Sequence, residues 1–210
     1  MNLTIVEHPL AKHYLTTLRN SSTDNDAFRA AARRLTNTLV LEATRDVPAR
    51  EKPVETPMGT TTGHILADVV AVAVLRAGLG MLDAVVDMIP HVKVGFAGVQ
   101  RDEDTAEPIE YYVNLPEVDD ASVLILEPML ATGGSLSWAV DKAKEAGATD
   151  ITALCVVTAP EGVARMFADH PDVRIVAAAA DKELNDTYYI VPGLGDMGDR
   201  LFGTIDRPEL

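Results

Sequence analysis

Cysteine is almost absent from the sequence, since Cys155 is the only one among 210 residues. A single thiol cannot form an internal disulfide, which excludes the disulfide framework of a small secreted protein. Residues 1–14 contain no apolar core of a signal peptide, and no apolar run is long enough to span a bilayer. We therefore expect a cytoplasmic protein that has no membrane partner.

Positive charge is scarce as well. Lysine and arginine number 18 against 32 aspartates and glutamates, and the formal net charge is −14. Proteins that bind nucleic acid usually present a basic face, so we expect no nucleic-acid partner. A small anionic ligand remains compatible with this charge, because amides, arginines and a metal ion can form a local phosphate pocket in an acidic protein.

Internal repeats and low-complexity linkers are missing too, and the length predicts one domain over residues 1–210. Short apolar runs alternate with segments of helical periodicity. The predicted strands cover residues 68–75, 92–99, 121–126, 151–158 and 173–179, and the predicted helices cover residues 25–44, 78–89, 134–146 and a segment that starts near Pro160. Continuous apolar strands between helices are typical of an α/β fold, with a mostly parallel twisted sheet that helices flank on both faces.

The most specific motif lies within residues 124–140, where a predicted strand ends in Glu127 and a short loop leads to a predicted helix. The sequence TGGS, from Thr132 to Ser135, opens this helix. Backbone amides at a helix N-terminus bind anions, and glycine lets the backbone approach a phosphate closely. The two hydroxyls can donate further hydrogen bonds, and the Glu127 carboxylate can accept them from a ribose diol. The segment therefore predicts a site for a ribose 5-phosphate at the carboxyl edge of the sheet.

This loop is neither a Walker loop, which requires a lysine after its second glycine, nor a dinucleotide fingerprint. The stretch EPMLATGGS at residues 127–135 instead resembles the signature with which type I phosphoribosyltransferases bind PRPP (5-phospho-α-D-ribose 1-diphosphate), in the form that uracil phosphoribosyltransferases carry. That family normally has aspartate where this chain has Glu127. The similarity runs from HPLAKHYL near the N-terminus to LFGT near the C-terminus. It implies the type I phosphoribosyltransferase fold, with a small C-terminal hood and a protruding β-arm.

Two arginines outside the loop match PRPP contacts of the family. Arg76 stands in VLRAGLG, which resembles the pyrophosphate loop of the family, and a cis peptide next to Arg76 is implied with it. Arg101 begins a charged segment that resembles a mobile lid over about residues 100–112, whose closure would exclude water. The acidic residues of that segment, Glu103, Asp104 and Glu107, are expected to be solvated. The resemblance assigns PRPP binding to Arg76, Arg101, Glu127, Pro128, Met129, Leu130, Ala131, Thr132, Gly133, Gly134, Ser135 and Asp196.

The C-terminal segment, about residues 185–203, is dense in glycine and contains YIVPGLGDMGD. Uracil presents an acceptor, a donor and an acceptor along O2, N3–H and O4. A rigid backbone can answer with N–H, C=O and N–H, whereas cytosine would leave buried groups wrongly paired. The stretch resembles the uracil-binding segment of the family, which assigns uracil contacts to Ile190, Gly195, Asp196 and Met197. The family often has alanine at the position of Met197.

The resemblance implies that N1 of uracil displaces pyrophosphate from C1 of PRPP, giving UMP in pyrimidine salvage. The transition state should resemble an oxocarbenium ion, as in glycosyl transfer generally. Arg76, Arg101 and Mg²⁺ would stabilise the leaving diphosphate, and the metal would arrive with PRPP because no cluster in the sequence has metal-ligand spacing. Asp196 is the nearest candidate for a general base. The implied catalytic residues are therefore Arg76, Arg101 and Asp196, with no metal ligand from the protein.

The resemblance also has implications for assembly and regulation. It implies that the chain forms a homodimer or homotetramer. It also implies GTP as a possible effector, since some members of the family respond to GTP, but no motif in the sequence locates a GTP site. Residues 45–63 are polar and rich in proline, threonine and glycine, which predicts a protruding hairpin or a loop that could embrace a neighbouring subunit.

Three alternative functions stay open at this point. A related enzyme could use hypoxanthine or orotate, although that would require a different base-binding segment. Some RNA-binding attenuators keep a phosphoribosyltransferase fold, but they use a basic face that an acidic chain does not favour. A purely structural domain would leave the phosphate loop and both arginine motifs unexplained.

Two residue types are not assigned to the chemistry. Cys155 lies in an apolar strand and is expected to be a buried thiol rather than a nucleophile. The five histidines do not cluster in the sequence, and we expect each to be a surface or structural residue.

Overall fold

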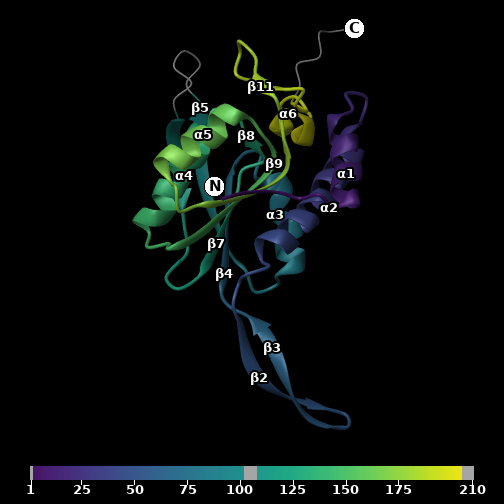
Figure 1. Ribbon diagram of the computed structural model, residues 1–210, viewed down its shortest axis with the longest axis vertical. Coiled ribbons are helices and arrows are strands. Elements are labelled where there is room, and N and C mark those ends of the chain that lie inside the picture. Colours follow the sequence, from purple (N-terminus) through teal and green to yellow (C-terminus); the bar gives the residue numbers. More distant parts are fainter. Residues whose placement is uncertain (1, 102–107, 205–210) are drawn as a thin grey trace.

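The computed structural model describes residues 2–101 and 108–204, and its centre is a twisted eight-stranded sheet (Figure 1). The strands lie in the order β1 (Leu3–Ile5), β10 (Arg174–Ala180), β9 (Asp150–Thr158), β7 (Ser122–Leu126), β4 (Val69–Leu75), β5 (Lys93–Arg101) and β6 (Pro108–Asn114). The eighth strand, β8 (Met129–Leu130), pairs with β9. All of these pairs are parallel except β5 with β6, which confirms the predicted, mostly parallel sheet.

Helices cover both faces of the sheet (Figure 1). On one face lie α1 (Pro9–Arg19), α2 (Asn25–Ala43) and α3 (Leu79–Met88), and on the other lie α4 (Gly134–Glu145) and α5 (Pro160–Asp169). Strand β4 shows why its sequence is apolar throughout. Val69 and Ala71 belong to the core on the α2 side, whereas Val70, Val72 and Val74 belong to the core on the α4 side. Each fully buried valine contributes roughly 1.5–3 kcal/mol by leaving water, so both faces of the strand stabilise the fold.

Several elements were not among those predicted from the sequence, and β1, α1 and β6 are the ones that pack in or against the main sheet. Strand β1 has three residues, too few for a periodicity to be recognised. Helix α1 begins at Pro9, and the imidazole of His8 caps it by accepting a hydrogen bond from the Leu10 amide at 3.1 Å. Strand β6 pairs with β5 within the segment that the sequence assigned to a lid. Residues 102–107 of that predicted lid lie outside the described residues.

A long hairpin projects from the body of the protein (Figure 1). Its strands β2 (Ala49–Thr56) and β3 (Gly59–Leu66) pair antiparallel along their whole length. Every residue of β2 is exposed, and so is every residue of β3 except Gly63. The structure therefore has a β-arm where the sequence left a hairpin and a loop as alternatives.

The hood, residues 181–203, lies at the end of the sheet opposite to the arm (Figure 1, yellow). It contains the antiparallel pair β11 (Glu183–Leu184) and β12 (Ile190–Val191), followed by helix α6 (Met197–Phe202). The Asp196 side chain caps α6 by accepting a hydrogen bond from the Asp199 amide at 2.8 Å. The sequence marked this stretch as glycine-rich but did not predict its short helix.

Candidate active site

A pocket of about 350 Å³ opens between the hood and the carboxyl edge of the sheet. Parallel strands place their carboxyl ends at one edge, so loops that are far apart in the chain meet there. The pocket is lined by Ala77, Glu127, Met129, Ala131, Ser135, Tyr188, Tyr189, Ile190, Gly195, Asp196, Met197 and Gly198. It therefore joins the loop after β4, the loop after β7 and the hood in one cavity.

The phosphate loop, residues 127–135, forms the floor of this site. It starts at Glu127, which is 8% exposed, and reaches Gly133 with φ at 83° just before α4 begins. A side chain at that glycine would be strained, and its Cβ would lie 3.0 Å from the carbonyl oxygen of Gly162 on α5. Glu127 and residues 129–136 also line a second hollow of about 20 Å³. Because the amides of a first helical turn have no partner inside the helix, this hollow suits one phosphate group.

The loop after β4 borders the same cavity. The peptide between Leu75 and Arg76 is cis, as the resemblance implies. Gly78 is packed so tightly that a Cβ there would lie 2.4 Å from the Leu126 carbonyl oxygen at the end of β7. The loop is thereby held against the strand that carries Glu127 into the site. The Arg76 side chain is 56% exposed and pairs with Asp199 of α6, with 3.1 Å between Nη2 and Oδ1.

The hood supplies the opposite wall. Ile190 and Met197 are buried, at 5% and 1% exposure, whereas Tyr188 and Tyr189 are about half exposed at the rim, at 52% and 48%. Gly195 has φ at 79°, a backbone conformation that residues with a side chain rarely adopt. This wall therefore combines backbone groups, at its glycines, with the apolar side chains of Ile190 and Met197. The Asp196 carboxylate, which caps α6, lies beside them.

The structure brings most of the predicted site residues together. The main pocket contains Glu127, Met129, Ala131, Ser135, Ile190, Gly195, Asp196 and Met197, and the small hollow adds Leu130, Thr132, Gly133 and Gly134. Pro128 lines neither cavity, because it is buried and its carbonyl oxygen accepts hydrogen bonds from the Val156 and Val157 amides. Arg76 stands at the edge, and the side chain of Arg101 lies outside the described part of the chain.

The sequence analysis missed four residues that line the main pocket, Ala77, Tyr188, Tyr189 and Gly198, and one that lines the small hollow, Leu136. Three of them, Ala77, Leu136 and Gly198, directly follow residues that the motifs had singled out. The tyrosine pair carries a signal of its own, since adjacent aromatic side chains before a glycine-rich stretch suit a half-exposed rim that contacts a planar ligand.

Comparison with known proteins decides the family. The sequence model described as uracil phosphoribosyltransferase matches residues 5–204. The uracil phosphoribosyltransferase of Salinibacter ruber is 48% identical over 205 residues, covering 97% of this chain and 98% of that protein. The chain belongs to the uracil phosphoribosyltransferase family.

Solved structures agree with this family at the level of the fold. A protein from Aquifex aeolicus superposes with a TM-score of 0.94 at 38% identity, covering 98% of this chain and 100% of that one. The APRTase from Giardia lamblia, complexed with 9-deazaadenine, superposes with a TM-score of 0.52 at 16% identity over 72% of this chain and 80% of that one. The second likeness concerns the fold alone, so the identity of the base has to be argued from the hood.

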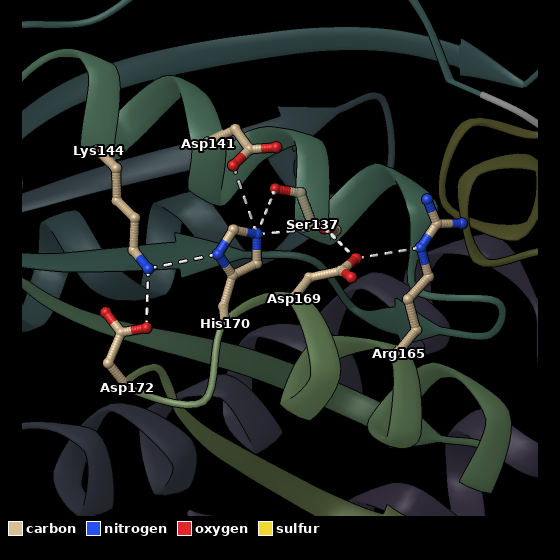
Figure 2. Close-up of polar contacts among 7 residues, drawn as sticks. All are labelled: Ser137, Asp141, Lys144, Arg165, Asp169, His170 and Asp172. Atoms are coloured by element: carbon tan, nitrogen blue, oxygen red, sulfur yellow. Dashed lines mark hydrogen bonds and ion pairs between the residues drawn. The ribbon is translucent and has the colours of Figure 1, made fainter.

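A polar cluster outside the pocket resembles a hydrolase triad at first sight (Figure 2). His170 and Ser137 are both 5% exposed, and Nε2 of the ring lies 3.1 Å from the serine Oγ. An ammonium group only donates, so Lys144, with Nζ at 3.3 Å, makes Nδ1 of His170 the acceptor and leaves the ring proton on Nε2. That nitrogen therefore cannot accept the serine proton.

The serine hydroxyl has another partner in this cluster. Ser137 Oγ donates to Asp169 at 2.8 Å, and this hydrogen bond lowers the pKa of the Asp169 carboxyl group. Nε2 of His170 lies 3.1 Å from the Ser137 carbonyl oxygen and donates to it. The cluster ties α4, whose N-terminus borders the small hollow, to the end of α5 (Figure 2). In this family member it is a structural connection and not a nucleophile.

Two further observations concern metal binding and membrane-spanning helices. Within residues 2–101 and 108–204, no three His, Cys, Asp or Glu side chains converge in a way that could hold a metal ion. Over the same residues, the structure has no helix with the length and apolar character that a membrane crossing requires.

We predict that Cys155 is inert toward thiol reagents in the folded protein. Its side chain is fully buried in β9, and burial, followed by the negative charge of Glu127, raises the pKa of the thiol well above its ordinary value. Only the thiolate reacts, so an aromatic disulfide reagent should give no signal at pH 8 and one equivalent of thiol after unfolding in guanidinium. Stoichiometric labelling of the folded chain would contradict this burial.

Proposed function

We propose that the chain transfers the phosphoribosyl group of PRPP to uracil, producing UMP and pyrophosphate in pyrimidine salvage. One observation carries the proposal: a single pocket joins an anion-binding helix N-terminus to a hood wall that is rich in main-chain groups. A ribose phosphate anchored at α4 would place its C1 in front of that wall. Family membership supports the choice of uracil as the base.

The PRPP half of the site follows from three groups. The first-turn amides of α4, with the hydroxyls of Thr132 and Ser135, would bind the 5-phosphate. Glu127 would accept hydrogen bonds from the 2- and 3-hydroxyls of the ribose, since it lies at the end of β7 on the pocket wall. Arg76 would donate to the diphosphate, in keeping with its exposed guanidinium at the pocket edge.

Arg101 would complete the diphosphate site from the end of β5. In this proposal, residues 100–112 act as a lid that closes over bound PRPP. Closure would exclude water, which could otherwise attack C1 of the ribose in place of uracil and hydrolyse PRPP through the same oxocarbenium-like transition state. Arg101 and Arg76 would then stabilise the negative charge that develops on the leaving diphosphate.

In this proposal, uracil is recognised mainly by backbone N–H and C=O groups of the hood. Ile190, Gly195 and Met197 line the wall, and their peptide groups can match the fixed acceptor–donor–acceptor edge of uracil. Met197, where the family often has the smaller alanine, is buried, and a contact through its backbone would survive that difference. Asp196 is the nearest candidate for a general base, but its Oδ1 already accepts the hydrogen bond that caps α6.

Mg²⁺ belongs in this proposal as part of the substrate. Among the described residues, the acidic side chains that line the pocket are Glu127 and Asp196, and no three metal-ligating side chains converge. This lining fits a metal ion that arrives bound to PRPP. The ion would neutralise charge on the diphosphate when bound, and the chain itself would orient that diphosphate through Arg76.

Assembly, regulation and location are further parts of the proposal. The exposed β-arm, with Met58 at 96% exposure near its tip, supports a homodimer or homotetramer in which the arm embraces a neighbour. GTP as an effector rests on the family resemblance alone, and a cytoplasmic location stays a prediction from the sequence.

Pyrophosphate release tests the phosphoribosyl chemistry. We expect the purified chain to release pyrophosphate from PRPP only when uracil and Mg²⁺ are both present, and to stop when excess EDTA is added. Ion chromatography of quenched samples measures the pyrophosphate directly, so the readout itself does not depend on Mg²⁺. Release at the same rate without uracil would indicate a hydrolase, and RNA binding at physiological salt without any release would favour the attenuator alternative.

A further inference from the structure

The backbone that leads into the base wall is held by side chains from outside the pocket. Between β12 and α6, residues 192–196 have no regular secondary structure, and Gly193 has φ at 57°. Its N–H donates to Asp181 Oδ2 at 2.9 Å, and its carbonyl oxygen accepts a hydrogen bond from Arg19 Nη1 at 2.7 Å. Both main-chain polar groups of Gly193, one from each of the two peptide units that flank its Cα, are therefore bound by residues that do not line the pocket.

The two side chains that hold Gly193 are also paired with each other. Arg19 Nη1 and Nη2 donate to the two carboxylate oxygens of Asp181, at 2.8 and 2.5 Å. The aspartate side chain is 5% exposed and the arginine side chain is 25% exposed. A bidentate, largely buried pair of this kind has a fixed geometry, and removing one partner leaves an uncompensated charge.

A second arginine fixes the next residue along the loop. Arg200 Nη1 donates to the Leu194 carbonyl oxygen at 2.8 Å, and Nη2 donates to the Asn20 carbonyl oxygen at 2.7 Å. The same guanidinium donates to the Leu18 carbonyl oxygen and lies over the Phe28 ring, 4.3 Å from its centroid. Burial lowers the pKa of Arg200, although the group stays charged.

The end of α1 is therefore the anchor for the hood. Arg19 is its last residue, and the carbonyl groups on either side of that arginine receive Arg200. Two successive carbonyl groups, of Gly193 and Leu194, are pinned immediately before Gly195, the first wall residue of this loop. None of the hydrogen bonds described above reaches the phosphate loop, which is carried by β7 and α4.

We propose that Asp181, Arg19 and Arg200 are positioning residues that set the affinity and selectivity for the base, with little influence on PRPP. The inference rests on the proposed function, because it assumes that the wall reads uracil through its peptide groups. Main-chain recognition discriminates only if the peptides cannot rotate, and these three side chains hold the three successive peptide units between Pro192 and Gly195. A displacement of about 1 Å in such a wall can cost up to about a hundredfold in rate.

The test combines kinetics with hydrogen exchange in the Asp181→Asn variant. We expect the KM for uracil to rise about tenfold, the preference for uracil over cytosine to fall, and the KM for PRPP to stay within about twofold of the wild type. Amide exchange, measured by mass spectrometry, should accelerate in residues 190–197 and stay unchanged in residues 127–136. Arg19→Lys keeps the charge but loses the two parallel hydrogen bonds of the guanidinium. It should also raise the KM for uracil and leave the KM for PRPP unchanged, with a smaller effect than Asp181→Asn.

The matched control is Glu42→Gln. It removes a carboxylate that pairs with Arg45 and Arg174 and does not line the candidate active-site pocket. The Glu42 side chain is 21% exposed, so it is less buried than Asp181, but it also pairs with a partly buried arginine, because Arg174 is 23% exposed. We expect no change in either KM. Equal rises in the KM for uracil and PRPP in Asp181→Asn, or unchanged exchange in residues 190–197 in both variants, would overturn the inference. A wild-type chain that forms no UMP would instead overturn the proposed function, and the exchange data would still show whether Asp181 and Arg19 hold the wall.

Discussion

Replacing Glu127 with alanine is expected to raise the Kd for PRPP about a hundredfold. The carboxylate is 8% exposed, lies at the end of β7 and lines both the main pocket and the small hollow. In the proposed complex it accepts two hydrogen bonds from the ribose hydroxyls, and each hydrogen bond to a charged group is worth about 1.5–3 kcal/mol. Isothermal titration calorimetry with PRPP and Mg²⁺, in the absence of uracil, measures the effect directly.

Glu127→Asp is the matched control for this experiment. It keeps the carboxylate and installs the residue that the family normally carries, so PRPP affinity should remain within about tenfold of the wild type. Thermal melting of both variants would show that the fold persists. If the alanine variant bound PRPP as tightly as the wild type, the ribose-diol role of Glu127 would be wrong.

Arg101→Ala is expected to lower kcat by about a hundredfold to a thousandfold, while the melting temperature stays near that of the wild type. Loss of one preorganised donor to a developing negative charge has this size in other enzymes. Arg101 is the last residue of β5 and, in the proposal, closes onto the diphosphate with the lid. Steady-state kinetics with saturating PRPP and uracil separates this loss from a loss of binding.

Glu103→Ala serves as the control within the same segment. The sequence assigns this residue to solvent, so its removal should leave kcat and both KM values unchanged. Unchanged kinetics in Arg101→Ala would remove the lid assignment, and equal losses in both variants would point to a general disturbance of the segment rather than to one guanidinium.

The sheet and the position of the candidate phosphate loop could be predicted because their signals are local. The sequence of β4 is apolar at every position, which predicts a strand that is buried on both faces of the sheet. The TGGS stretch carries its own chemistry, since the loop and the helix that it opens are adjacent in the chain. The structure places these residues at the carboxyl edge of the sheet, where the alternation of strands and helices had located them.

The hood residues that line the pocket, which we propose to bind the base, could be named from the sequence, but the side chains that support them could not. Asp181 and Arg19 are 162 positions apart, and nothing near either residue indicates that they form a pair. The role of Arg200 depends likewise on carbonyl groups at the end of α1, a helix that the sequence analysis did not predict. Contacts of this kind arise from tertiary packing, because side-chain donors bind whichever backbone acceptors the fold brings near.

Formation of UMP is the measurement that tests the central claim most directly. The purified chain would be incubated with PRPP and Mg²⁺ together with uracil, cytosine or orotate, and the nucleotides separated by anion-exchange chromatography. We predict UMP from uracil and no nucleotide product from the other two bases, because only uracil matches a wall of fixed peptide groups. A nucleotide from cytosine or orotate at a comparable rate, or no UMP from a chain that binds PRPP, would contradict this account of the site.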